Sequence, residues 1–200
     1  MVSNVKGKSV DIREVVFNNR SYTPIPLIVI VLILAEPTWT SFILGAFIAL
    51  SGEFLRIWGV SHAGSATRTT SGAGGNELIT SGPFAIIRNP LYLGNFFITI
   101  GFAIASWAWM PWMLLVVIVL FGLQYWLIVS LEEEYLSRHF GYMYQKYKNH
   151  VPRFFPRLSP WNDRQRRSGN WREAFRSERS TLTSFITFLV VLWARWRLFS

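Results

Sequence analysis

The chain has no cysteine and little negative charge: its 200 residues include 20 lysines and arginines but only 11 aspartates and glutamates, a formal net charge of +9. The absence of cysteine excludes disulfide bonds, thiolate metal sites and cysteine nucleophiles. Charged residues make up 16% of the chain and apolar residues 51%, whereas soluble domains contain roughly 25% charged residues. The apolar content also argues against an intrinsically disordered chain.

Other common site motifs are missing as well. The three histidines, His62, His139 and His150, are isolated in the sequence and form no cluster with metal-ligand spacing. The glycines at 72–75 do not have the spacing of a dinucleotide-binding loop and follow no strand. The sequence therefore predicts no metal site and no nucleotide-binding domain of the usual soluble kind.

The longest uncharged stretch indicates the class of protein. No charged residue occurs between Arg88 and Glu132, a run long enough for two bilayer-spanning helices of about 20 residues each. Tryptophans, which favour the membrane interface, and Pro111, which suits a helix start, lie in its middle. We therefore predict a transmembrane hairpin of Leu91–Trp107 and Pro111–Leu131.

Three further apolar runs extend this pattern. Pro24–Ala35 and Thr40–Gly59 flank a short turn at Glu36 and predict a second hairpin, and Leu182–Trp193 predicts a last helix near Arg195. The first and last of these runs are short enough to be interfacial or re-entrant instead, and Arg195 fits poorly in a helix that crosses. The expected fold is an all-α integral membrane protein with about five transmembrane helices built around two hairpins.

The basic residues predict the orientation, because basic loops stay on the cytoplasmic side. Both predicted hairpin turns lack lysine and arginine, whereas the N-terminal segment, the 60–90 loop and the 132–180 segment contain most of them. These three segments should share the cytoplasmic face of a multi-pass protein. We expect a cytoplasmic segment at 1–23, a membrane core at 24–156, a basic cytoplasmic segment at 157–180 and a membrane or interfacial helix at 181–200.

Polar groups gather after the fourth predicted span. Glu132, Glu133 and Glu134 are adjacent at a hydrocarbon boundary, where carboxylates are costly to desolvate. Either at least one faces a polar cavity or a cationic ligand, or all three are solvated at a helix start. Apolar residues at helical spacing then predict one amphipathic helix, with Gly141 as its weak point: Leu136, Phe140, Met143, Tyr144 and Tyr147.

The arginine-rich stretch after this helix has two readings. It includes Trp161 and Trp171 and lies between apolar runs. We expect it to be attracted to anionic membrane lipids and expect no nucleic-acid partner.

Two stretches of the chain carry recognisable motifs. The first reads LITSGPF at 78–84 and RNPLYLG at 88–94. The second contains Glu132-Glu133, Phe140-Gly141, Tyr144, Tyr147-Lys148 and Val151-Pro152-Arg153. Together these stretches resemble the isoprenylcysteine carboxyl methyltransferase family, and phospholipid N-methyltransferases look similar in the same region. The resemblance implies a membrane enzyme that uses S-adenosylmethionine without a Rossmann domain, with a cofactor pocket at the cytoplasmic face.

The resemblance also implies site residues. The implied cofactor contacts are Asn76, Glu77, Leu78, Ile79, Phe84, Asn89, Pro90, Leu91, Tyr92 and Glu132. Glu132 suits the amino group of the positively charged cofactor, and Arg88 suits an anionic group on the cofactor or substrate, so these two are the catalytic candidates. The chain departs from the family at Asn89, where a histidine is usual, at Phe84, which lacks a tyrosine hydroxyl, and at Ile128, where prenylcysteine methyltransferases place an arginine.

The leading hypothesis is methyl transfer to a lipophilic small molecule or lipidated substrate. A carboxylate acceptor, as in isoprenylcysteine carboxyl O-methylation, is preferred, although Ile128 weakens that preference. A lipid amine is the alternative acceptor. An NADPH-dependent reductase of the sterol type and a non-enzymatic membrane adaptor are the rival readings.

Overall fold

The computed structural model describes residues 11–64 and 77–199, and the secondary structure in these ranges is helical throughout. This confirms the all-α fold class. Asn76, one of the expected cofactor contacts, lies outside the described residues. The elements in chain order are α1 (Ile12–Asn18), α2 (Pro24–Ile33), α3 (Trp39–Ala63), the 3-10 turn η2 (Gly82–Ala85), α4 (Pro90–Ser106), α5 (Trp112–Phe140), α6 (Tyr142–His150), α7 (Trp171–Ser177) and α8 (Arg179–Phe199).

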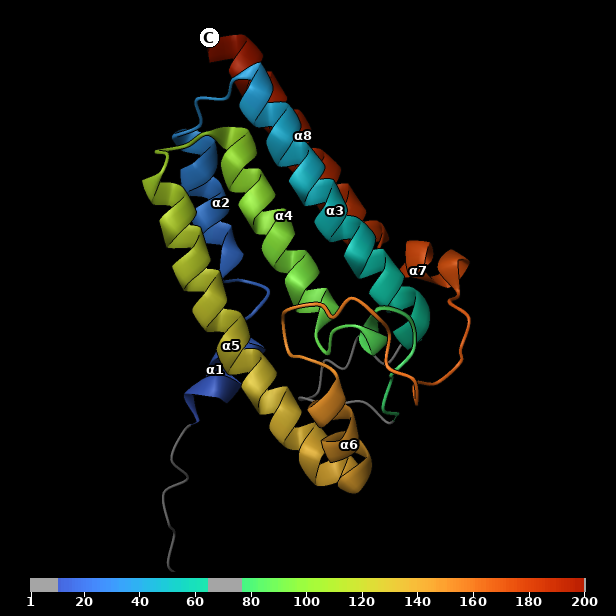
Figure 1. The fold of residues 1–200 in the computed structure, drawn as a ribbon. Coiled ribbons are helices and arrows are strands. Elements are labelled where there is room, and N and C mark those ends of the chain that lie inside the picture. The colour runs from blue at the N-terminus through green and yellow to red at the C-terminus, as the bar shows by residue number, and fades with distance from the viewer. Residues whose placement is uncertain (1–10, 65–76, 200) are drawn as a thin grey trace, which may run out of the picture.

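The apolar helices α2, α3, α4, α5 and α8 run side by side (Figure 1). Their direction reverses from each helix to the next along the chain. One end of the bundle contains α1, α6, the described residues just before α4 and the loop that follows α6, while the α2–α3 and α4–α5 turns lie at the other end. Three helices, α3, α5 and α8, are long and apolar enough to cross a membrane, and α2 and α4 are shorter apolar helices. Their outward faces carry large exposed side chains such as Phe47 and Leu123, as a lipid-facing surface requires. The structure thus fits an integral membrane protein, while the count of five spans and the orientation stay predictions.

Both predicted hairpin turns are present. Thr38 and Ser41 form a reciprocal capping box at the start of α3, with hydrogen bonds of 2.9 and 3.1 Å. At the other turn, α4 ends at Ser106, and α5 begins at Trp112, one residue after the predicted start. The Glu36 amide donates to the Ser106 carbonyl (2.9 Å), which joins the two turns at one end of the bundle.

The α3–α4 pair is packed through small residues. A Cβ atom added at Gly101 of α4 would lie 2.5 Å from the Ala49 backbone nitrogen, and one added at Gly45 of α3 would lie 2.2 Å from the Ala105 nitrogen. Gly52 on α3 approaches α4 equally closely. Glycine and alanine allow such close backbone contact between membrane helices, where lipid removes the usual hydrophobic driving force. The two helices therefore pack as one unit.

Arg195 of α8 binds the C-terminal end of α2, a contact that the sequence did not predict. Its guanidinium donates to the carbonyl of Ala35 and to that of Ile33 (2.7 Å), at the C-terminal end of α2. These carbonyls have no partner within their own helix, and a cation is favourable at this end of the helix dipole. The arginine that seemed misplaced in a membrane helix thus ties α8 to α2.

One helix prediction is wrong. The expected single amphipathic helix is divided at Gly141, whose φ of 49° ends α5 and begins α6. Glycine adopts this left-handed region without the strain of a side chain. Tyr144 and Tyr147 are buried within the protein, whereas Met143 is 66% exposed, so Met143 does not share a face with the two tyrosines.

Replacing Gly101 by valine should destabilise the protein, because the new side chain would overlap the backbone of α3. Overpacking of this kind costs about 1–3 kcal/mol, and each kcal/mol lowers Tm by about 2–4 °C for a protein of this size. Thermal unfolding in detergent measures the effect. The matched control is Gly122→Val, because Gly122 has no heavy atom within 4 Å of an added Cβ; equal Tm losses for both variants would contradict the close α3–α4 packing.

Candidate functional site

Three consecutive carboxylates on α5 define the polar end of the bundle. Successive side chains on an α-helix point about 100° apart, so Glu132, Glu133 and Glu134 face three different neighbours. The sequence left two possibilities: that at least one carboxylate faces a polar cavity, or that all three are solvated. The structure favours the first, because Glu133 is 3% exposed and Glu132 lines an internal cavity.

Glu133 is the centre of a buried ion cluster. Arg88 contacts its Oε1 through Nε (3.0 Å) and a terminal nitrogen (3.0 Å), and Arg153 contacts its Oε2 at 2.5 Å. Arg88 also donates to the carbonyls of Lys148 (2.8 Å) and Val151 (2.7 Å) at the end of α6. This cluster joins α5 to the segment before α4 and to the chain that leaves α6.

Glu134 faces the opposite side of α5 and holds α1 in place. Its carboxylate binds Arg13 (2.8 Å) and Arg138, the latter one turn along the same helix. Arg13 also pairs with Asp11 (2.6 Å), the residue that caps the start of α1. These contacts keep the pKa of the Asp11 carboxyl below its usual value, because the Arg13 guanidinium and amide both donate to it.

Glu132 faces the interior. The Tyr92 hydroxyl donates to its Oε1 (2.6 Å), and both residues line a cavity of about 500 Å³ between α1, α2, α3, α4, α5 and α8. The volume is in the range of small-molecule sites. The Tyr92 ring lies 5.5 Å from the Tyr125 ring, and both tyrosines line the cavity. A carboxylate with aromatic rings in the same cavity is well suited to a cationic group.

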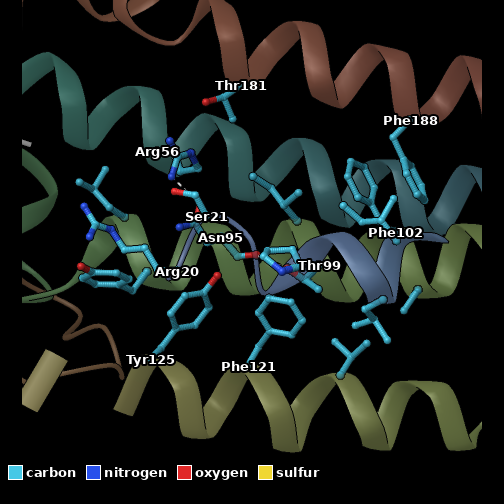
Figure 2. A pocket seen from close by; sticks show the side chains of 18 of the residues that line it. Arg20, Ser21, Arg56, Asn95, Thr99, Phe102, Phe121, Tyr125, Thr181 and Phe188 are labelled. Carbon is cyan, nitrogen blue, oxygen red and sulfur yellow. Dashed lines mark hydrogen bonds between the residues drawn. The ribbon is translucent and has the colours of Figure 1, made fainter. Parts of the chain in front are cut away.

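The cavity is polar at one end and apolar at the other (Figure 2). The polar groups come from five helices or their ends: Arg20, Ser21, Arg56, Asn95, Tyr125, Glu132 and Glu178. Phe102 and Phe188 lie toward the opposite end, with rings stacked 4.0 Å apart. A second and more apolar cavity, of about 380 Å³ between α2, α4 and α8, shares these two phenylalanines. Together the two cavities have the size and polarity to accommodate an amphipathic molecule with one polar end.

A further ion cluster lies in the wall of the cavity. Arg56 of α3 binds Glu178 (2.6 Å), which lies between α7 and α8, and donates to Asn95 of α4. Glu53 lies 3.7 Å from the Arg56 Nε, and both oxygens of this buried carboxylate lack hydrogen-bond partners among the described residues. The cluster joins the start of α8 to α3 and α4 and forms part of the cavity wall.

The loop before α4 is covered by the chain that follows α6. Backbone hydrogen bonds join Ala85 to Trp161 (2.9 Å) and Arg88 to Pro152 (2.9 Å). The Tyr147 hydroxyl donates to the Phe84 carbonyl (2.7 Å), and burial raises the pKa of this phenol, so it stays protonated and able to donate. The first part of the basic segment therefore packs against the loop, and its expected attraction to anionic lipid stays a prediction.

The expected cofactor contacts fall into two groups. Leu91, Tyr92 and Glu132 line the large cavity. The others that the structure describes lie outside its lining, in or next to the covered loop: Glu77, Leu78, Ile79, Phe84, Asn89 and Pro90. Among the latter, Leu78 packs against Tyr144, Tyr147 and Trp161.

Two residues that differ from the family pattern take structural positions. The Asn89 side chain donates to the Arg153 carbonyl (3.2 Å), next to the Glu133 cluster. Ile128 is fully buried in the hydrophobic core and does not line the cavity. Arg88, a catalytic candidate, is likewise bound within the Glu133 cluster rather than directed into the cavity.

Sequence reasoning missed the polar residues that come from the ends of the chain. Arg20 and Glu178 both line the cavity, yet they lie in segments expected to be cytoplasmic and basic. Arg56 gave a usable signal, because it and Glu53 are charges within an otherwise apolar run and such residues mark buried polar sites. No group of histidines and acidic residues suited to a metal ion occurs in the described part of the chain.

Comparison with known proteins gives a family match. The phospholipid methyltransferase family model matches residues 40–143, just over half of the chain. The nickel-cobalt-cadmium resistance protein NccN of Alcaligenes xylosoxydans xylosoxydans is 34% identical over 89 residues, which cover 44% of this chain and 40% of that protein. The cobalt-zinc-cadmium resistance protein CzcN of Cupriavidus metallidurans is 35% identical over 92 residues, with the same coverage. The chain thus spans less than half the length of these relatives, and no solved structure matches it.

Replacing Arg88 by methionine should lower the stability of the protein and not only its affinity for a ligand. The change removes one of the two cations that bind the buried Glu133 carboxylate. Breaking a buried ion pair costs about 3–5 kcal/mol. Adding Glu133→Gln should recover part of the loss, since the uncompensated charge is then removed. Thermal unfolding of the single and double variants measures this coupling. A stable Arg88→Met protein would contradict the structural role and support direct ligand binding.

Proposed function

The chain belongs to the phospholipid methyltransferase family, and on that premise we propose that it is a membrane-embedded S-adenosylmethionine-dependent methyltransferase with a lipophilic carboxylate as acceptor. The observation that carries the proposal is the Glu132 carboxylate, which faces the polar end of a cavity that becomes apolar toward Phe102. Family membership favours methyl transfer over the reductase and adaptor readings. The isoprenylcysteine-type acceptor remains part of the proposal.

The residues present fit the proposed cofactor. Glu132 is a partly buried carboxylate with a tyrosine hydroxyl as its hydrogen-bond partner among the described residues, so a cationic group would complement its charge. Glu132 would hold the cofactor's amino group, and Tyr92 would keep the carboxylate oriented. Leu91, next to Tyr92 on α4, would supply apolar contact at the same end of the cavity.

The chemistry needs little from the protein beyond position and the exclusion of water. When bound, S-adenosylmethionine supplies a sulfonium methyl group, to which an acceptor oxygen bonds as the carbon–sulfur bond breaks and its electrons stay on the departing neutral thioether. A carboxylate acceptor has no proton to lose, so no general base is required. Holding reactants in line can supply about 7–11 kcal/mol of the barrier. The apolar walls would keep water away, and the buried Glu133 cluster would fix the position of α5.

The acceptor class can be tested by the stability of the product. Membranes containing the protein are incubated with S-adenosylmethionine labelled with tritium in the methyl group, and the lipids are extracted. We expect label that is released as methanol by mild base, as for a methyl ester. Base-stable label would identify an amine acceptor instead. No label above that of membranes lacking the protein, together with no cofactor binding by folded protein, would overturn the methyltransferase proposal.

Glu132→Gln should weaken binding of S-adenosylmethionine at least tenfold, because a hydrogen bond to a charged group contributes about 1.5–3 kcal/mol. Titration calorimetry of detergent-purified protein measures the affinity. The matched control is Glu134→Gln, the same change two residues away, where the carboxylate binds Arg13 and Arg138. Equal affinity in wild type and Glu132→Gln would remove Glu132 from the cofactor site.

A further inference from the structure

The two arginines that line the large cavity differ in their partners. Arg56 is bound by Glu178 at 2.6 Å and has Glu53 at 3.7 Å. Arg20 has no carboxylate oxygen within 4.0 Å in the described part of the chain. Its guanidinium instead donates to the Phe17 carbonyl (2.8 Å) and lies 3.9 Å from the centre of the Phe17 ring. Arg20 therefore lines the cavity as a cation that forms no ion pair within 4.0 Å among the described residues.

This arrangement is unusual for the site. Arg88 and Arg153 share Glu133, and Arg13 binds both Asp11 and Glu134. A cation beside apolar walls is costly to keep without an anionic partner. A ligand that brings an anionic group to Arg20 would recover that cost.

The position of Arg20 is well defined. It follows α1, which Arg13 and Glu134 fasten to α5. Arg20 and Glu132 both line the large cavity. Figure 2 places Arg20 at the polar end with Tyr125, while Phe102 lies toward the other end. An anionic group at Arg20 would thus lie beside the carboxylate proposed to hold the cofactor, with an attached chain extending toward the phenylalanines.

We propose that Arg20 is a specificity-determining residue that binds the carboxylate of the lipid acceptor, whose apolar chain occupies the Phe102–Phe188 end of the cavity. The inference rests on the proposed function, because it assigns the acceptor's place within the same site. Arg20 lies outside the segment that matches the family, residues 40–143, so this recognition would belong to the N-terminal part of this chain.

The test compares two probes with the same chain length, palmitate and hexadecanol, for binding to detergent-purified protein by retention of radiolabel. Wild type should prefer palmitate. Arg20→Gln should bind palmitate roughly tenfold to a hundredfold more weakly, the range for a charged hydrogen bond, with hexadecanol and S-adenosylmethionine binding unchanged. Arg20→Lys, which keeps the charge without the planar fork, should retain part of the preference. Arg157→Gln is the matched control, because Arg157 does not line the cavity and its guanidinium donates only to the His150 carbonyl among the described residues.

Three results would overturn the inference. Unchanged palmitate binding in Arg20→Gln would remove the residue from recognition. Equal loss of palmitate and hexadecanol would indicate a packing effect. Weaker S-adenosylmethionine binding would assign Arg20 to the carboxylate of the cofactor instead of the acceptor. Probe binding requires no turnover, so failure of methyl transfer is recognised separately by the absence of labelled product and of cofactor binding.

Discussion

The geometry of this site depends on one helical segment whose three adjacent carboxylates attach it to three different parts of the chain. Glu133 binds the arginines of the two loops beside α6, and Glu134 binds α1. With Glu133 and Glu134 held by these partners, Glu132 faces the cavity, where the Tyr92 hydroxyl of α4 donates to it. Like charges this close would repel in isolation. Because each carboxylate binds a different partner, the three contacts together fix the rotation of α5 about its axis.

The cavity beside Glu132 is built from more than the family-like core. Helices α3, α4 and α5 supply one part of its wall, whereas Arg20, Glu178 and Phe188 come from segments outside the family match. A shared core with different terminal segments is a simple way to keep one chemistry and change the acceptor, because the reacting groups stay in place while the wall around the acceptor differs.

Local signals allowed much of the fold to be predicted, and they failed where distant segments meet. The uncharged run before Glu132 and the turn at Glu36 gave the hairpins, because length and polarity decide what can lie in lipid. The same reasoning could not foresee that Arg56 and Glu178 pair across the bundle. It also took Gly141 as a weak point within one helix, because glycine tolerates both signs of φ and the sequence alone does not reveal the positive φ that it adopts here. The candidate cofactor residues came from the family resemblance, and their separation into cavity-lining and loop groups is a property of the three-dimensional arrangement.

The glycine contacts between α3 and α4 have a mechanical consequence. Two backbones in direct contact have no side chains between them that could rearrange, and close-packed interiors transmit strain instead of yielding. This side of the bundle is therefore stiff. On the opposite side, α2 is a ten-residue helix, tied to α8 through Arg195 at one end. We therefore expect a motion that exchanges a lipid to displace α2 rather than to separate α3 from α4.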